Sequence, residues 1–175
     1  MAKSLRQVGA VPFVRRPDGE LRVLLVTSRE TKRWVIPKGW PMKGRNASGA
    51  AAQEAFEEAG ARGRVKGEKL GRYHYLKRLR DGTEAPCVVH VFPLLVDHLA
   101  ETWPEQDERR REWFTPLDAA NHVDEPELRE ILRTLEPVLA TEEKPARGRK
   151  RHPKSARKRM SKKTVAALRQ IEPAT

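Results

Sequence analysis

Three glutamates lie close together in one short stretch of the chain, Gln53-Glu54-Ala55-Phe56-Glu57-Glu58-Ala59-Gly60. In an α-helix each residue advances by about 100°, so Glu58 falls about 40° from Glu54 on one side and Glu57 about 60° from it on the other. The three carboxylates therefore share one narrow face of a predicted helix. Such a face can bind a hard divalent cation through oxygen ligands. It can also be an ordinary solvated acidic face, because like charges at these spacings oppose a helix by only about 0.2–0.5 kcal/mol per pair.

A glycine loop precedes this helix and favours the cation-binding alternative. Gly39 lies between Pro37 and Pro41, beside Lys38 and fifteen residues before Glu54. A loop that returns to the acidic face adds backbone carbonyl oxygens to the carboxylates, and such ligands suit Mg²⁺ or Mn²⁺ rather than zinc. The histidines and the single cysteine are scattered without the spacing of a zinc site. The pattern predicts a magnesium or manganese site.

The elements that must position this face follow from hydrophobic periodicity and from turn residues. The acidic stretch lies in a predicted helix over residues 47–59, with Gly60 where a left-handed C-terminal cap belongs. Its alanines and Phe56 point away from the carboxylates, which predicts packing against a sheet. Pro93 predicts an edge strand or a bulge at its position. Apolar or alternating runs predict strands over residues 8–14, 21–27, 34–36, 73–76 and 87–96 and from residue 113, and a second helix over residues 125–139.

Charge divides the chain into two unequal parts. The whole chain carries 36 Lys and Arg against 24 Asp and Glu, a net charge of +12. Residues 141–175 alone hold 12 Lys or Arg and 3 Glu, so this last fifth carries +9 and residues 1–140 carry +3. This distribution excludes a protein that is basic along its whole length, such as an extended nucleic-acid binder. It predicts one globular domain over residues 1–140, followed by a basic, largely disordered tail over residues 141–175.

The tail and the cysteine count bear on partners and location. Eleven Lys or Arg between Lys144 and Lys163 predict binding to nucleic acid or another polyanion through charge. This binding would be non-specific, because no aromatic side chains are interleaved for base stacking. A localisation signal and a solubilising extension without a partner are the alternatives. Cys87 is the only cysteine, which excludes an intramolecular disulfide, and no apolar run reaches the roughly 18 residues of a transmembrane segment. We therefore expect a cytoplasmic protein, and the sequence leaves its oligomeric state open.

With these residues in place, the chain resembles the Nudix hydrolases. Their motif, the Nudix box, is G-x5-E-x7-R-E-U-x-E-E-x-G-U with U apolar, and Gly39 through Gly60 follow its spacing without a gap. Arg45 stands where the first glutamate belongs, and Gln53 stands where the arginine belongs. In the family these two positions usually brace the loop against the helix as an ion pair, and an Arg45–Gln53 hydrogen bond would replace that brace here. The resemblance spans about residues 5–139, and residues 33–39 and 111–114 look like the branch that hydrolyses diphosphoinositol polyphosphates and diadenosine polyphosphates.

The resemblance implies a fold and a set of roles. The fold is α/β, the Nudix α/β/α sandwich with a mixed β-sheet between helices, and the activity is metal-dependent hydrolysis of a diphosphate linkage. The resemblance assigns Mg²⁺, or Mn²⁺, to Glu54, Glu58 and the Gly39 carbonyl. It makes Glu57 the general base or a residue that shares in metal binding. A small anionic phosphorylated substrate would be bound by basic residues around the catalytic loop, namely Arg29, Lys38, Arg33 and Arg6.

Three functions compete on this sequence. The first is hydrolysis of a diadenosine polyphosphate or a diphosphoinositol polyphosphate. The second is housecleaning hydrolysis of nucleoside di- or triphosphates. The third is a Nudix-fold module that binds a nucleotide or RNA without hydrolysing it, which Arg45, Gln53 and the basic tail favour. Candidates for stacking on a nucleobase are Trp40, Tyr73, Tyr75 and Trp103.

Overall fold

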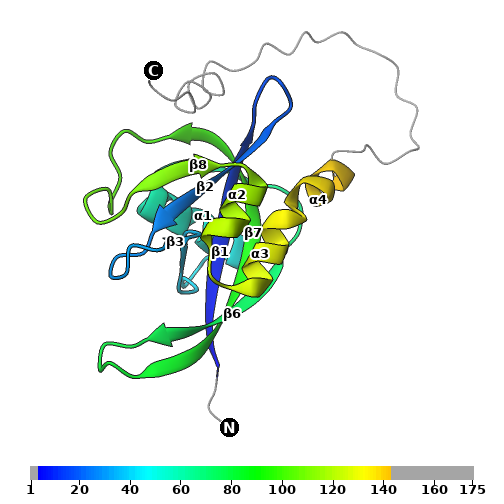
Figure 1. The fold of residues 1–175 in the computed structure, drawn as a ribbon. Helices are drawn as coiled ribbons and strands as arrows, with labels where there is room; N and C mark the ends of the chain where they lie inside the picture. Colours follow the sequence, from blue (N-terminus) through cyan, green and yellow to red (C-terminus); the bar gives the residue numbers. More distant parts are fainter. Residues whose placement is uncertain (1–3, 143–175) are drawn as a thin grey trace.

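A mixed β-sheet forms the centre of the computed structural model, which describes residues 4–142 (Figure 1). Strand β1 (Leu5–Arg15) pairs on one side in parallel with β7 (Glu84–Leu99). On its other side β1 pairs antiparallel with β2 (Leu21–Thr27) and with the two-residue strand β4 (Lys38–Gly39). The strands predicted over residues 8–14 and 21–27 are confirmed, and they pair with each other as a hairpin.

The remaining strands extend the sheet outward from β2 and β7. Strand β2 pairs antiparallel with β3 (Trp34–Val35) and β8 (Arg111–Phe114). Strand β7 pairs antiparallel with β5 (Ala61–Val65) and β6 (Gly71–Arg78), so one long strand supports two short partners in succession. Because β1 and β7 are parallel and their neighbours are antiparallel, the sheet is mixed, as predicted.

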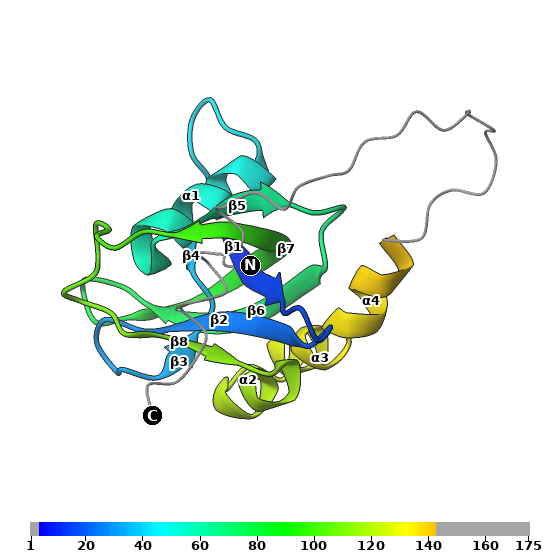
Figure 2. The same ribbon diagram turned by 90° about the horizontal axis from the view of Figure 1, so that it is seen from above.

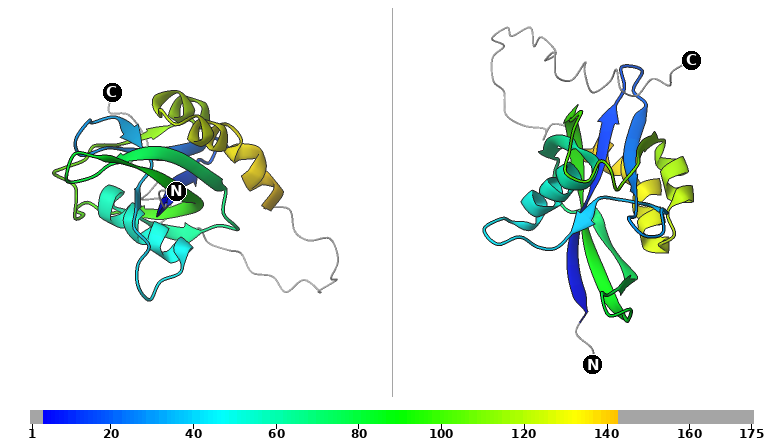
Figure 3. Two further views of the ribbon diagram at one scale, coloured as in Figure 1. Left: turned by 90° about the horizontal axis from the view of Figure 1, so that it is seen from below. Right: turned by 90° about the vertical axis from the view of Figure 1, so that its left-hand side faces the viewer.

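Helices cover both faces of this sheet (Figures 2 and 3). Helix α1 (Ala47–Ala59) packs on one face with Val8, Leu24 and Val26. The other face is covered by α2 (Pro116–His122), α3 (Pro126–Arg133) and α4 (Leu135–Glu142). The buried alanines of α2 and the buried leucines of α3 and α4 pack on this face. The α/β/α sandwich implied by the resemblance is confirmed.

Helix α1 begins and ends where its sequence predicts. The Asn46 side chain caps its first turn by accepting a hydrogen bond from the Gly49 amide at 2.8 Å. Gly60 closes it with φ of 65°, a left-handed conformation that costs glycine little. Four alanines of the helix are fully buried, which brings its backbone close to the sheet. The helix therefore holds its polar face at a fixed distance from β1 and β4.

The second predicted helix is two helices in the structure. Residues 125–139 were expected to be continuous, but α3 ends before Thr134 and α4 starts at Leu135. Pro137 explains the break, because it has no amide hydrogen to donate to the Arg133 carbonyl and its ring crowds that carbonyl. Both helices still bury their leucines against the sheet, since Leu128, Leu132, Leu135 and Leu139 are all buried.

The prediction of an edge strand at Pro93 was wrong. Strand β7 is paired on both sides, and Pro93 itself lies opposite Val11 of β1. On the other side the partner changes at this point, because β6 pairs only as far as Val91 and β5 starts at Leu94. The Pro93 carbonyl accepts from the Lys66 amide on that side, so the missing amide hydrogen faces the junction between the two partner strands. The irregularity in the pairing lies further along, between Arg62 and Gly63.

The predicted tail falls almost wholly outside the described residues. Only its first two residues, 141 and 142, are described, and they belong to α4. The domain boundary, the disorder of the tail and its binding to polyanions stay predictions. Within residues 4–142, no helix is both long enough and apolar enough to cross a bilayer.

Candidate functional site

Gly39, in the loop of residues 37–41 that is predicted to be the catalytic loop, lies in direct contact with Glu54 of helix α1. The short strand β4 fixes Gly39, because Gly39 pairs with Val8 and Lys38 pairs with Gly9 of β1. A Cβ atom at position 39 would overlap the carboxyl group of Glu54. Only a glycine permits this approach, so the structure brings together two of the three predicted metal-binding residues.

The carboxyl group of Glu54 is partly buried and surrounded by other acids. Burial, together with the neighbouring carboxylates of Glu58, Glu57 and Glu105, raises the pKa of Glu54 to about 7, and the charge of Arg109 opposes that rise. Within the described part of the chain, no hydrogen-bond donor contacts this carboxyl group. When Glu54 is ionised, the protein therefore leaves its negative charge largely uncompensated.

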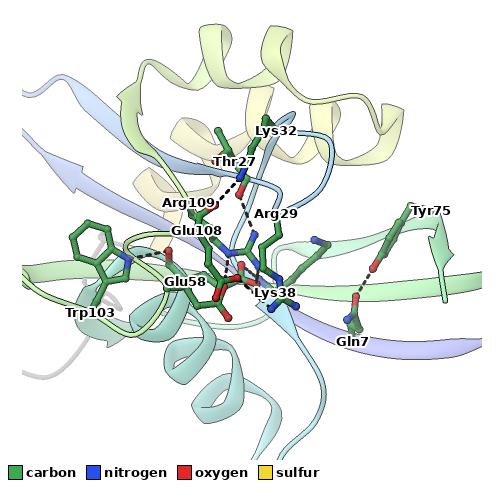
Figure 4. Close-up of polar contacts among 11 residues, drawn as sticks. Gln7, Thr27, Arg29, Lys32, Lys38, Glu58, Tyr75, Trp103, Glu108 and Arg109 are labelled. Atoms are coloured by element: carbon green, nitrogen blue, oxygen red, sulfur yellow. Dashed lines mark hydrogen bonds and ion pairs between the residues drawn. The ribbon is translucent and has the colours of Figure 1, made fainter. Parts of the chain in front are cut away.

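Glu58 has the opposite environment, because both of its carboxylate oxygens have donors (Figure 4). Its Oε1 accepts from Arg109 Nη2 at 2.6 Å, and its Oε2 accepts from the Lys38 backbone amide at 3.1 Å. Glu58 is only 5% exposed. Burial raises the pKa of Glu58, and the charges of Lys38 and Arg109 oppose that rise. This glutamate links the catalytic loop to the segment that precedes β8.

Arg109 is the residue that the sequence did not single out. Its side chain is 7% exposed and donates to Glu58, to Glu105 Oε2 at 2.5 Å and to the Thr27 carbonyl at 3.0 Å. In the sequence it is one of three consecutive arginines, residues 109–111, and nothing in that run distinguishes it from its neighbours. Only the folded chain shows that its guanidinium lies among the carboxylates.

The segment around residues 100–111 is anchored on the C-terminal end of α1. Trp103 Nε1 donates to the Glu58 carbonyl at 3.2 Å, and Arg111 donates to the carbonyls of Ala59 at 2.9 Å and Ala100 at 3.1 Å. The Arg111 guanidinium also lies 3.8 Å from the centre of the Trp103 ring system. Trp103 therefore binds the C-terminal end of α1 and holds the segment that carries Arg109 against it. Base stacking by Trp103 stays a prediction.

Glu57, the predicted general base, receives a hydrogen bond from within its own helix. Gln53 Nε2 donates to Glu57 Oε1 at 2.7 Å. Within residues 4–142 no hydrogen bond joins Gln53 to Arg45, so the suggested replacement for the family's brace does not form. Gln53 instead orients a carboxylate of the acidic face. The role of Glu57 as general base stays a prediction.

Two of the predicted substrate-binding residues, Lys38 in β4 and Arg29 in the loop after β2, lie near each other (Figure 4). The Lys38 ammonium lies 5.5 Å from the centre of the Tyr75 ring, and burial lowers its pKa although Glu58 opposes that shift. Arg29 is exposed, and its Nη1 is 3.5 Å from Glu108 Oε2. Lys32 donates to the Glu108 carbonyl at 2.9 Å, which ties the loop after β2 to the segment carrying Arg109 (Figure 4). Figure 4 shows that Lys38 and Arg29 both lie near Glu58, and their role in substrate binding stays a prediction.

The other two predicted substrate-binding residues lie elsewhere. Arg33 pairs with Glu125 at 2.8 Å and with Asp124 at 3.6 Å, so its charge is already balanced by the start of α3. Arg6 lines a separate pocket beside the N-terminal end of α1. The sequence could not separate these arginines from Arg29, because their partners come from distant segments of the chain.

The aromatic candidates also separate in the structure. Tyr73 is fully buried in the core. Trp40, next to Gly39, is 46% exposed, and the Lys77 ammonium lies 5.4 Å from its ring centre. Tyr75 donates from its hydroxyl to Gln7 Oε1 at 2.5 Å. Trp40 and Tyr75 are therefore the aromatic side chains nearest the catalytic loop.

The donor set at this site fits a hard divalent cation. Glu54, Glu57 and Glu58 supply only oxygen atoms, and the fit of Glu54 against Gly39 leaves an uncompensated carboxylate at the loop. Across residues 4–142, no three His, Cys, Asp or Glu side chains are already gathered at metal-binding distance. Each carboxylate oxygen of Glu58 already accepts one hydrogen bond, so Arg109 competes with a cation for this third carboxylate.

Comparison with known proteins decides the family. The model of the NUDIX domain matches residues 5–135, which covers the sheet, α1 and the segment carrying Arg109. The chain belongs to the Nudix family. The match includes the Gly39–Gly60 box with its two departures, so Arg45 and Gln53 are variations within the family.

Curated relatives are similar over much of the Nudix domain. Nudix hydrolase 21, chloroplastic, of Arabidopsis thaliana is 33% identical over 135 residues, which are 73% of this chain and 64% of the relative. Diphosphoinositol polyphosphate phosphohydrolase 3-beta of Bos taurus is 36% identical over 107 residues, 59% of this chain and 61% of the relative. The chain thus spans less than two thirds of the length of either. Because the first is named as chloroplastic, the cytoplasmic location stays a prediction.

Solved structures share the fold at low sequence identity. The binary complex of the C. elegans Ap4A hydrolase has a TM-score of 0.59 and 20% identity, and covers 78% of this chain and 98% of that chain. The NUDIX domain of Shewanella oneidensis NrtR, complexed with ADP ribose, has a TM-score of 0.59 and 17% identity, and covers 79% of this chain and 90% of that chain. These similarities support the Nudix sandwich.

Proposed function

We propose that this Nudix protein hydrolyses a diphosphate linkage with the help of Mg²⁺ or Mn²⁺. The observation that carries the proposal is the contact of Glu54 with Gly39. There the protein keeps a partly buried carboxyl group that has no hydrogen-bond donor within residues 4–142 and lies beside three other acidic side chains. Holding these like charges together is unfavourable in the protein alone. A divalent cation would relieve this repulsion, and Glu54 and Glu58 with the Gly39 carbonyl would hold it.

The substrate we propose is a diadenosine polyphosphate or a diphosphoinositol polyphosphate. Two of the similar proteins are named for such molecules, a diphosphoinositol polyphosphate phosphohydrolase and an Ap4A hydrolase. Both substrates carry several phosphates, which suits the ammonium of Lys38 and the exposed guanidinium of Arg29 beside the acidic face. The exposed Trp40 ring next to Gly39 offers a surface for the uncharged part of the substrate.

The roles of the chain's own groups follow from their positions. Lys38 and Arg29 would orient the phosphate chain and offset its charge. Glu57, held by Gln53, would accept the proton of the attacking water. The bound cation would neutralise the phosphate oxygens and lower the pKa of water. Trp103 and Arg111 would act only by fixing the end of α1.

The test is turnover on both substrate classes, with Mg²⁺ and Mn²⁺, followed by identification of the released products. We expect metal-dependent turnover on one of the two, and a large loss of kcat in Glu57→Gln and Glu58→Gln. Either variant that kept wild-type kcat at saturating Mg²⁺ would remove that residue from the assignment. Arg64→Gln is a matched surface control, because its exposed ion pair with Asp97 lies on β5 and β7.

A binding module without hydrolysis is a second candidate, which one observation favours. The ion pair between Glu58 and Arg109 at 2.6 Å occupies a carboxylate that metal binding would need. If that pair persists with Mg²⁺ present, the site can bind a nucleotide but lacks part of its metal-binding set. Tight binding of a nucleotide without metal-dependent turnover on any of the polyphosphates would select this candidate.

A further inference from the structure

A second pocket lies on the α1 side of the sheet, at the N-terminal end of that helix. Its volume is about 400 Å³, which is in the range of small-molecule sites. The pocket is bounded by the start of β1, by the loop between Gly39 and α1, and by residues 90–92 of β7. Figure 3 shows that these elements meet where the first half of β1 leaves the body of the domain. None of the three glutamates of the acidic face lines it.

The rim of this pocket is cationic. Arg6, Arg45 and Lys69 line it and are exposed, and no acidic residue lines it. Within residues 4–142, no ion pair joins any of these three side chains to a carboxylate. His90 also lines the pocket, and its Nδ1 lies 3.3 Å from Lys69 Nζ.

Three basic side chains lie close enough to His90 to affect its pKa. Partial burial lowers the pKa of His90, and the positive charges of Lys69, Arg6 and Arg72 lower it further. Arg72 lies directly across from His90 in the pairing of β6 with β7. Arg6 and Lys69 have no ion-pair partner within residues 4–142, and like charges of this kind are unfavourable alone and favourable with an anion among them.

The floor of the pocket is apolar. Val8 and Ala50 are buried at its base, and Phe92 and Pro41 complete the apolar lining. Asn46 and Ala47 add the first turn of α1, whose free amide hydrogens also favour an anion. A ligand that satisfies both parts has a phosphate for the rim and an uncharged ring for the floor.

We infer that this pocket binds a phosphorylated small molecule with an uncharged ring, such as a nucleoside monophosphate, at a site separate from the acidic face. Arg6, Arg45 and Lys69 contact the phosphate, and Phe92 and Val8 contact the ring. The pocket shares a wall with the loop that carries Gly39, so its ligand is placed to influence the catalytic loop. Binding needs no divalent cation, because the pocket contains no carboxylate.

The experiment follows the imidazole of His90 by NMR in EDTA, with AMP, inorganic phosphate and adenosine as probes. We expect AMP to shift the His90 ring signals saturably and to raise its pKa, since a bound anion favours the imidazolium. Phosphate shifts them at higher concentration, and adenosine least. Arg6→Ala and Lys69→Ala each weaken AMP binding about tenfold, the effect of losing a charge-assisted hydrogen bond. Lys66→Ala, an exposed lysine outside the pocket, leaves binding unchanged.

Two further variants separate this pocket from the hydrolytic site. Glu54→Gln keeps the His90 response if AMP binds in the pocket, and changes it if AMP binds at the acidic face. Arg45→Glu reverses a charge on an exposed loop and weakens AMP binding without touching the core. The inference is overturned if AMP leaves His90 unshifted, or if the response survives Arg6→Ala, Lys69→Ala and Arg45→Glu. Since the measurement needs neither metal nor turnover, its failure would leave the proposed hydrolysis untouched.

Discussion

Replacing Arg109 by leucine tests the electrostatics of the acidic face most directly. The substitution retains most of the apolar volume but removes the guanidinium that lies between Glu58 and Glu105. Both members of the Glu58–Arg109 pair are almost fully buried, with side chains 6% and 7% exposed. The variant Arg109→Leu therefore leaves a buried carboxylate with only one remaining donor, the Lys38 amide.

The expected cost follows from that burial. Removing one partner of a buried ion pair typically destabilises a protein by about 3–5 kcal/mol, because the other charge stays buried and uncompensated. Glu58 can limit the loss by taking up a proton, since burial already raises its pKa. We therefore expect the low end, about 3 kcal/mol. For a domain of this size that loss lowers Tm by roughly 6–12 °C.

A divalent cation should recover part of this loss. Without Arg109, the carboxylates of the acidic face repel one another more strongly and the guanidinium no longer competes with a metal ion for Glu58. If the affinity for Mg²⁺ rises tenfold, saturating Mg²⁺ stabilises the variant by about 1.4 kcal/mol more than the wild type. The stabilisation by Mg²⁺ should thus be greater in Arg109→Leu than in the wild-type protein.

Calorimetry in EDTA and in Mg²⁺ measures both effects. Arg110→Leu is the matched control, because its side chain is exposed and its backbone amide bond to Thr27 is retained. A drop in Tm of less than about 2 °C in EDTA would refute the account of the buried pair. An equal Mg²⁺ response in variant and wild type would show that Glu58 does not share a site with the metal.

Three further predictions concern the loop, the acidic face and the helix cap. Gly39→Ala places a Cβ inside the carboxyl group of Glu54, so we expect metal-dependent turnover to fall about a hundredfold while the circular dichroism spectrum is retained. The pKa of Glu54 is about 7, above its ordinary value of 4.5, so between these pH values the folded protein keeps a proton that the unfolded chain releases. Without metal, Tm should therefore fall as the pH rises from about 4.5 to 7. The variant Glu54→Gln should show a smaller dependence of Tm on pH. Gly60→Ala forces a left-handed alanine against Trp103, and we expect a loss of at least about 1–2 kcal/mol in urea unfolding with an unchanged m-value.

Local signals in the sequence predicted the elements that carry the site. The helix over 47–59 and its Gly60 cap were predicted because their cause lies within the segment itself, in the spacing of alanines and in one left-handed residue. The break at Thr134 was missed because apolar spacing continues through Pro137, and the periodicity outweighed the proline. The edge strand at Pro93 was predicted wrongly because a proline shows only that one amide hydrogen is missing. It does not show whether a neighbouring strand is absent there or whether two partner strands meet there.

Long-range pairings in the site could not be predicted. Arg109 is 51 residues from Glu58, and only the docking of Trp103 on the end of α1 brings it there. Arg33 looked equivalent to Arg29 in the sequence, yet the start of α3 neutralises it through Glu125. Counting basic residues near a catalytic loop therefore overestimates how many are available to a substrate.

The helical repeat places the three glutamates on one face of α1, but in the folded chain their carboxyl groups have different hydrogen-bond partners. Glu58 has an arginine and a backbone amide, Glu57 has the amide of Gln53, and Glu54 faces only the bare Cα of Gly39. A cation gains most beside the carboxylate that the protein compensates least. The glycine of the loop thus does more than permit a turn, because it keeps Glu54 both partly buried and without a partner. Any substitution that gives Glu54 a donor would stabilise the protein and weaken the same site.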